Sequence, residues 1–191
     1  VRASDLLLVD LNAKNFGIAE GQVVDPTAIN LHGQLHRLLP HAKCILHTHM
    51  PYTTALACLR DFEFLMLDQN ACRFYKRIAY DRDYAGMALE ASEGDRVAHV
   101  LGKEKSVLFL ANHGVIVVGN SVAEAFDELY YLEKAAQLQV LALSTGRELA
   151  LIDDETADLV CKQWLEYPKS AEHHFAALIE ILDQQSSDYK N

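Results

Sequence analysis

The chain has 191 residues, half of them apolar, and its 17 Lys and Arg against 27 Asp and Glu give a formal net charge of −10. This length and apolar content suffice for one compact α/β domain with its own core. The acidic balance, without a cluster of basic residues, argues against nucleic acid and anionic membranes as partners. No apolar stretch approaches the ~20 residues of a membrane-spanning helix.

The first 80 residues predict a mixture of strands and helices. In chain order we expect a strand at 6–9, a short strand at 23–24, a helix at about 27–39, a strand at 44–49, a helix at 51–60, a short strand at 62–67, a turn or short helix at 70–75 and a strand at 77–80. Asp25 or Thr27 is the candidate N-cap of the first helix, and Pro51 suits the first turn of the second.

The rest of the chain predicts longer helices. We expect a helix at 92–101 closed by Gly102, strands at 106–110 and 115–118, a long helix at 122–143 and a helical region at 154–182 interrupted at Pro168. Ser121 and Glu124 form a candidate capping box for the long helix. Because no linker divides the chain, the sequence predicts a single domain over residues 1–185 and a flexible tail over 186–191.

Four cysteines occur, none of them in a C-x-x-C pair: Cys44, Cys58, Cys72 and Cys161. Most lie in apolar runs, which indicates buried free thiols and a reducing, cytoplasmic location. No signal peptide is visible, and the chain begins with Val1 rather than methionine.

Three histidines follow apolar runs in a pattern that indicates metal binding. His47 and His49 are two residues apart at the end of a predicted strand, so their side chains point the same way. His113 follows a second apolar run, 107–110. Three neutral imidazoles with an open fourth position are typical of catalytic zinc, although nickel, cobalt, manganese and iron also accept imidazole. The alternative is a hydrogen-bonded polar cluster without an ion.

Four segments extend this pattern and together resemble the class II aldolase/adducin family: TAINLH at 27–32, ILHTHMP at 45–51, ANHGVIVVG at 111–119 and SVAEAF at 121–126. The resemblance covers roughly residues 3–143. The H-x-H-x-P and N-H-G-x-x-x-x-G segments, about 64 residues apart, are its most specific part. The first segment is more similar to adducin-type head domains and their bacterial relatives than to the sugar-phosphate aldolases.

The resemblance implies an α/β fold, a three-layer α/β/α sandwich around a central, mostly antiparallel sheet. It also implies that His47, His49 and His113 hold a divalent metal ion, most often zinc. The aldolases and epimerases of the family act on small hydroxy-carbonyl compounds or sugar phosphates through a metal-stabilised enediolate. They are usually homotetramers, so the resemblance implies a metal-dependent carbon–carbon lyase or epimerase that forms a homo-oligomer.

The sequence departs from the aldolases at two expected catalytic positions. The family's basic glutamate falls on Ala28 or Ile29, depending on the alignment, and neither side chain accepts a proton. The family's acidic tyrosine falls at Asp68, which becomes the candidate acid. The family's phosphate-binding segment is expected upstream of Val1, so the N-terminal part of the family domain is expected to be absent.

Other polar residues are further candidates. Asn30 and His32 belong to the first family segment, so they are candidates for contacting the substrate or a ligand histidine. Three tyrosines near acidic residues are alternative acids: Tyr75, Tyr80 and Tyr84. Two further functions compete with the enzyme. One is an adducin-like metal-binding domain without turnover, used for oligomerisation or partner binding, and the other is a small-molecule sensor.

Overall fold

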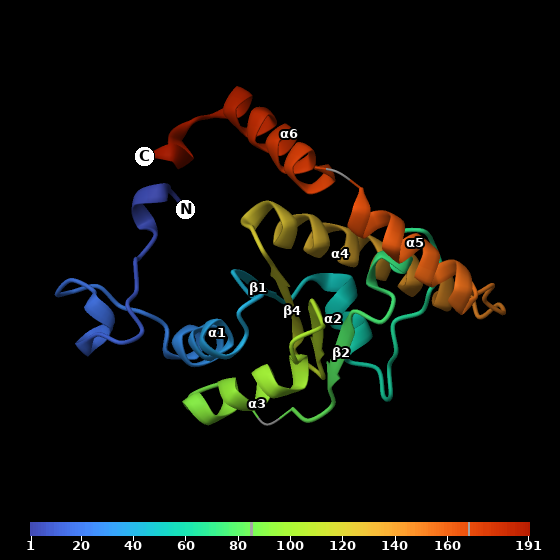
Figure 1. Cartoon of the computed structure of the whole chain (residues 1–191), viewed down its shortest axis with the longest axis horizontal. Helices are drawn as coiled ribbons and strands as arrows, with labels where there is room; N and C mark the ends of the chain where they lie inside the picture. The colour runs from blue at the N-terminus through green and yellow to red at the C-terminus, as the bar shows by residue number, and fades with distance from the viewer. Residues whose placement is uncertain (85, 168) are drawn as a thin grey trace.

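A mixed sheet lies at the centre of the molecule (Figure 1). The computed structural model describes residues 1–84, 86–167 and 169–191, and of residues 14 and 15 it describes the backbone only. Within these residues the sheet has four strands: β1 Cys44–Thr48, β2 Ile78–Asp81, β3 Val107–Leu110 and β4 Gly114–Gly119. Their order is β1-β4-β3-β2, with β4 antiparallel to β1 and β3, and β2 parallel to β3. The mostly antiparallel sheet is therefore confirmed.

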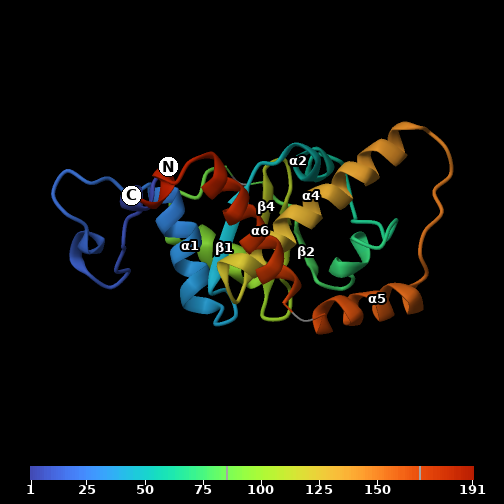
Figure 2. The ribbon, with the colours of Figure 1, turned by 90° about the horizontal axis from the view of Figure 1, so that it is seen from above.

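Helices cover both faces of this sheet. The main helices are α1 Pro26–Leu38, α2 Pro51–Ala57, α3 Ala91–Leu101, α4 Val122–Ser144, α5 Asp154–Glu166 and α6 Ser170–Gln185. Short 3-10 turns occur at Ala3–Asp5, Lys14–Gly17, Ala71–Phe74 and Asp188–Lys190. Figure 2 shows α1 and α4 running past the sheet on separate sides. The break expected at Pro168 falls outside the described residues.

Alternating side chains of the central strands divide the core in two. Val107 and Phe109 of β3 join the cluster under α2 and α4, where Leu56 and Leu132 are fully buried. Leu108 of β3 points to the opposite cluster, beneath α1 and α3. Because both faces of the strand are covered, β3 is apolar at every position. The two clusters produce the three-layer α/β/α sandwich that the resemblance implies.

The predicted strand at 62–67 is wrong, although its apolar side chains are buried. Phe64 packs in the core, but its N–H donates to the hydroxyl oxygen of Tyr80 at 2.8 Å. The next N–H, of Leu65, donates to Oε1 of Gln139 at 3.1 Å. Side-chain acceptors therefore replace a neighbouring strand as the partners of this backbone.

The predicted strands at 6–9 and 23–24 are also absent from the described structure. Leu6, Leu8 and Val23 are exposed rather than packed. An apolar run becomes a strand only where another strand offers free N–H and C=O groups, and none lies beside these segments within the described residues. Both segments precede α1, whose N-cap is Asp25 as expected.

A buried carboxylate fixes the connection that follows β1. Glu133 of α4 accepts hydrogen bonds from the N–H groups of Tyr52 and Thr53, at 2.8 and 2.9 Å. These are donors of the first turn of α2, which have no partner within that helix. The segment from His49 to Pro51 is thereby held between the sheet and a fixed helix start.

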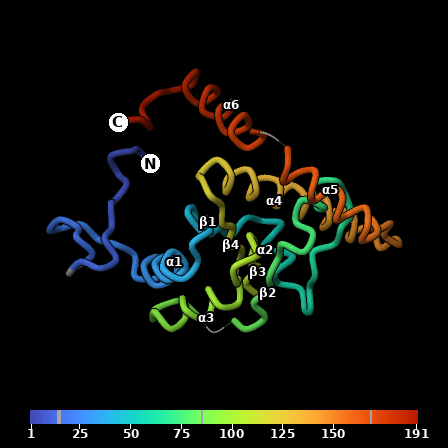
Figure 3. The backbone as a smooth tube through the Cα atoms, viewed as in Figure 1, coloured from blue at the N-terminus to red at the C-terminus, as the bar shows by residue number. Residues whose placement is uncertain are grey.

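The two ends of the chain lie side by side (Figures 1 and 3). The N–H of Ser4 donates to the carbonyl oxygen of Asn191 at 3.0 Å. The tail contains a short turn at Asp188–Lys190, while its mobility and the single-domain boundary at 185 stay predictions. Among the described residues, none of the helices has the length and apolar character needed to cross a bilayer.

Candidate metal centre

The topology of the sheet brings the three histidines to one edge. Because β1 and β3 are both antiparallel to β4, they run in the same direction and end at the same edge. His47 lies on β1 and His49 directly after it, while His113 lies three residues after the end of β3. Positions about 64 residues apart in the sequence thus become neighbours.

The three imidazoles lie close enough to share one cation. Their candidate ligand nitrogens all lie within 4.8 Å of one another, and their ring centroids are 4.7–4.9 Å apart. Nε2 of His47 and Nε2 of His49 are 3.2 Å apart. Two imidazoles on a tetrahedral zinc ion place their nitrogens about 3.3 Å apart, given Zn–N bonds of roughly 2.0–2.1 Å. The nitrogens of His47 and His49 already have that spacing. The other pairs of ligand nitrogens, up to 4.8 Å apart, must approach each other when an ion binds.

The protonation of His47 suits a ligand. Its Nδ1 lies 3.0 Å from the carbonyl oxygen of Val115. A carbonyl only accepts, so Nδ1 carries the hydrogen and the Nε2 lone pair faces His49. The pKa of His47 is lowered to about 4, mainly by burial; the Val115 bond opposes the shift, and the nearby His113 and His49 add to it. Burial also lowers the pKa of His113. Both rings are therefore neutral at pH 7.

The turn that carries His113 is tight. Asn112 adopts a left-handed φ of 56°, which asparagine tolerates better than most residues. The N–H of His113 donates to the carbonyl oxygen of Leu110 at 3.1 Å. A Cβ atom at Gly114 would lie 2.4 Å from the carbonyl oxygen of Thr48 and 2.8 Å from Cδ2 of His49. Glycine is therefore required for β4 to start this close to the end of β1.

The candidate acid Asp68 is engaged elsewhere. Its two carboxylate oxygens accept from the N–H groups of Asn70 and Ala71, at 3.2 and 2.9 Å. It thus caps the 3-10 turn Ala71–Phe74, which packs against α5 and α4. The structure does not group Asp68 with the three histidines.

The remaining candidates from the first family segment lie on α1. The side-chain amide of Asn30 donates to the carbonyl oxygen of Ala88 at 3.2 Å, which ties α1 to the loop before α3. His32 lies near enough to His47 to influence its pKa, and burial lowers the pKa of His32 itself. Ala28 and Ile29 occupy the first turn of α1, which contains no acidic residue. The nearest carboxylate in sequence, Asp25, accepts from the N–H and the hydroxyl of Thr27 as the N-cap.

The three candidate tyrosines separate in the structure. The hydroxyl oxygen of Tyr80 accepts from Phe64 inside the aromatic core. The ring of Tyr75 lies under the ammonium group of Lys76, at 4.8 Å. Only the ring of Tyr84, among these three, lies beside a candidate ligand, with its centroid 6.0 Å from that of His113.

An ion-pair cluster beside this edge was not anticipated from the sequence. Arg96 of α3 donates to both carboxylate oxygens of Asp81 at the end of β2, at 2.8 and 2.6 Å, and also binds Glu93. These hydrogen bonds raise the pKa of Arg96 and lower that of Glu93. All three side chains line a small hollow of about 30 Å³ together with His113. No motif marks Arg96, because its partner is 15 residues away in the sequence.

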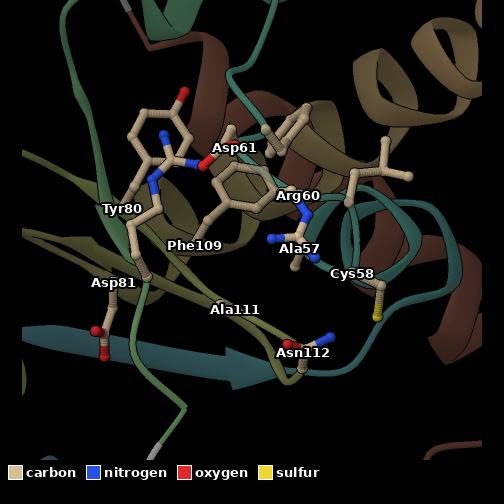
Figure 4. A pocket seen from close by; sticks show the side chains of 12 residues that line it. Ala57, Cys58, Arg60, Asp61, Tyr80, Asp81, Phe109, Ala111 and Asn112 are labelled. Carbon is tan, nitrogen blue, oxygen red and sulfur yellow. The ribbon is translucent and has the colours of Figure 1, made fainter.

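A larger cavity of about 400 Å³ lies on the other side of the turn between β3 and β4 (Figure 4). Phe109 and Tyr80 form its aromatic wall, and Arg60 and Asn112 face it from the ends of α2 and β3. Phe109 belongs to the core under α2 and α4, whereas Ile45, two residues before His47, belongs to the core under α1 and α3. The described residues that line this cavity include none of the three histidines, and Asp81 and Ala111 border both this cavity and the small hollow beside His113.

Comparison with known proteins agrees with this geometry. Residues 1–140 match the model of the class II aldolase and adducin N-terminal domain. The chain belongs to the class II aldolase/adducin family. A solved aldolase II superfamily protein from Pseudomonas syringae superposes with a TM-score of 0.84 at 32% identity, over 96% of this chain and 73% of that one. The class II aldolase fold is thus confirmed.

Relatives of this class II aldolase/adducin protein include both branches of the family. A Caulobacter vibrioides protein, whose name assigns it provisionally to the class 2 aldolases, is 34% identical over 171 residues, 85% of this chain. Human β-adducin is 30% identical over 173 residues, 84% of this chain. The chain spans 62% of the first relative and 23% of the second. Sequence likeness alone therefore does not choose between an enzyme and an adducin-like role.

Proposed function

We propose that this protein is a metal-dependent lyase or epimerase of the class II aldolase type. The observation that supports the proposal is the convergence of His47, His49 and His113 with the tautomer of His47 fixed by Val115. Neutral imidazole nitrogens favour zinc among the common divalent ions. A divalent ion bound there would supply the Lewis acidity that polarises a carbonyl and stabilises an enediolate.

The substrate class follows from the same site. Adjacent hydroxyl and carbonyl oxygens chelate a single ion, so we propose a small hydroxy-carbonyl compound, with or without a phosphate. His49 is exposed, and His47 and His113 are half-buried, so a substrate reaches the histidines from solvent. With their lone pairs on the ion, the three imidazoles would fix the position of the ion and so the orientation of the substrate.

An adducin-like domain without turnover is the second candidate, supported by the identity to β-adducin and by Ala28 and Ile29 at the expected glutamate position. The open geometry of the site favours the enzyme. His49 is exposed, so an ion on the three imidazoles would keep a position open to a ligand, whereas a metal site that only stabilises a domain is closed.

Metal analysis is the first test of the proposal. Protein purified without chelators is expected to contain about one zinc per chain, and His47→Ala should lose most of it. His99→Ala is the matched control, since His99 is exposed on α3. A wild-type protein that binds no divalent ion under any loading condition would rule out the enzyme.

Turnover is the second test. The zinc-loaded protein is assayed for retro-aldol cleavage and epimerisation over a panel of hydroxy-ketones and their phosphates. Activity that disappears in His47→Ala and survives in His99→Ala supports the proposal. Bound metal without turnover on any member of the panel would favour the adducin-like domain.

A homo-oligomer, a tetramer by family resemblance, is part of the proposal. Several apolar side chains of α4, α5 and α6 are exposed, among them Leu138, Leu141, Leu159, Leu165 and Ile181. An interface between copies of the chain would bury these side chains. Light scattering during size-exclusion chromatography is expected to give a multiple of the 21.4 kDa chain mass.

The cytoplasmic location, indicated by the four free cysteines, likewise stays a proposal.

A further inference from the structure

We propose that Tyr84 contacts the substrate at the three histidines and that its phenol hydroxyl donates a hydrogen bond to a substrate oxygen. The inference rests on the proposed function, because it assumes a ligand on the ion at His47, His49 and His113. It assigns a polar group to a site whose expected glutamate is absent and whose candidate acid, Asp68, caps a turn elsewhere.

The position of Tyr84 follows from the sheet. Strand β2 is parallel to β3, so it ends at the same edge as β1 and β3. Tyr84 lies three residues beyond the end of β2, as His113 lies three residues beyond the end of β3. The two rings meet edge to face, with centroids 6.0 Å apart and planes inclined by 68°. Tyr84 and His113 also line the same small hollow.

The loop that carries Tyr84 is anchored on both sides. Before it, Asp81 is held by two hydrogen bonds from Arg96 and accepts a third, at 3.3 Å, from the N–H of Asp83. Beyond it, the carbonyl oxygen of Ala88 accepts from the side chain of Asn30. Groups fixed at both ends of a loop restrict the positions that its side chains reach.

Tyr84 is exposed enough for its hydroxyl to meet a ligand that enters from solvent. Tyr84 is 56% exposed, whereas Tyr80 is half-buried against the aromatic core and hydrogen-bonded to Phe64. A phenol hydroxyl is a neutral hydrogen-bond donor. A hydrogen bond from such a donor is stronger when the oxygen carries negative charge, as the oxygen of an enediolate does.

The test measures the binding of a charged oxygen ligand rather than turnover. Cobalt(II) replaces zinc in the full chain, and its visible absorption reports acetohydroxamate, a small bidentate oxyanion that binds metal ions. Tyr84→Phe is expected to leave cobalt binding unchanged and to raise the dissociation constant of acetohydroxamate roughly tenfold. Because Tyr84 is exposed, the variant is expected to keep its fold, which thermal unfolding verifies.

Two matched variants sharpen the result. Tyr75→Phe removes the hydroxyl of a tyrosine whose ring lies under Lys76 and does not line the hollow of Tyr84 and His113. Asp83→Asn alters the carboxylate next to Tyr84 in the sequence. Neither is expected to change acetohydroxamate binding more than twofold. An unchanged Tyr84→Phe, or a larger effect in Asp83→Asn, would overturn the role of Tyr84 while leaving the proposed function intact. A wild-type chain that binds no cobalt would overturn both, as would a cobalt form that binds no acetohydroxamate.

Discussion

The imidazole of His47 and the backbone of Val115 are joined across the β1–β4 pair by a hydrogen bond of 3.0 Å from Nδ1 to the carbonyl oxygen. The bond fixes the orientation of the ring and leaves Nε2 as the nitrogen whose lone pair is available to an ion. A sheet backbone thus acts as the second partner of a candidate metal ligand, a role that a carboxylate fills in many zinc sites.

Acidification is expected to destabilise the metal-free protein. The pKa of His47 is about 4 in the folded chain and near 6.5 when unfolded, so the unfolded chain binds a proton first as the pH falls. The contribution of the neutral His47 to the free energy of unfolding is therefore fully present above about pH 6.5 and is lost progressively down to about pH 4. The urea concentration at the midpoint of unfolding should fall as the pH is lowered from about 6.5 to about 4.

The matched variants for this pH effect are His47→Gln and His99→Gln. The first removes the titrating group and should give a shallower loss of stability between pH 6.5 and 4. The second removes an exposed histidine and should behave as wild type. Equal slopes in wild type and His47→Gln would contradict the assignment.

Replacing Gly114 with alanine is expected to damage both fold and site. The new methyl group would meet the backbone oxygen of Thr48 and the ring of His49, which forces β1 and β4 apart. We expect a loss of about 1–3 kcal/mol in unfolding free energy and weaker zinc binding. Gly33→Ala is the control, since its nearest neighbour is the side chain of Leu11, at 3.1 Å. Zinc affinity unchanged in Gly114→Ala would argue against this close approach.

Zinc is expected to stabilise the fold measurably. A ligand at 100 times its dissociation constant adds about 2.7 kcal/mol, which corresponds to a rise in Tm of roughly 5–10 °C for a chain of this size. Differential scanning calorimetry with zinc and then with excess EDTA should show the rise and its reversal. His113→Ala should show neither, and an equal rise in that variant would place the ion elsewhere.

Asp127 is expected to be the most sensitive carboxylate for stability. It pairs with the buried Arg73, whose guanidinium lies against the rings of Tyr131 and Trp164, and it also accepts from His174 of α6 at 2.7 Å. Asp127→Ala leaves the buried Arg73 with only its longer contact to Glu128, at 3.8 Å, and should cost about 3 kcal/mol in urea unfolding.

A surface ion pair provides the comparison for Asp127. Asp158 pairs with Lys162 on α5, where the side chain of Lys162 is exposed and that of Asp158 is partly exposed. Asp158→Ala should change the unfolding free energy by less than about 1 kcal/mol. Similar losses of unfolding free energy in Asp127→Ala and Asp158→Ala would mean that the burial of Arg73 adds little to the effect of Asp127.

Local sequence was sufficient for many elements. The N-caps Asp25 and Ser121, the glycine closing α3 and the continuous apolar runs of β3 and β4 all predicted structure that formed. Each depends on residues within a few positions, because caps, turns and strand alternation are local properties. The same reasoning failed at 62–67, where Tyr80 and Gln139 supply backbone partners from distant positions.

The sequence by itself determined the candidate ligands, since the spacing of His47 and His49 and the motif around His113 mark them without coordinates. Only the tertiary structure decided which other polar groups lie beside them. It assigned Asp68 to a turn, Tyr80 to the core and Tyr84 to the edge near His113. The physical reason is the order β1-β4-β3-β2, which brings the ends of three like-directed strands to one edge, and no local pattern contains that order.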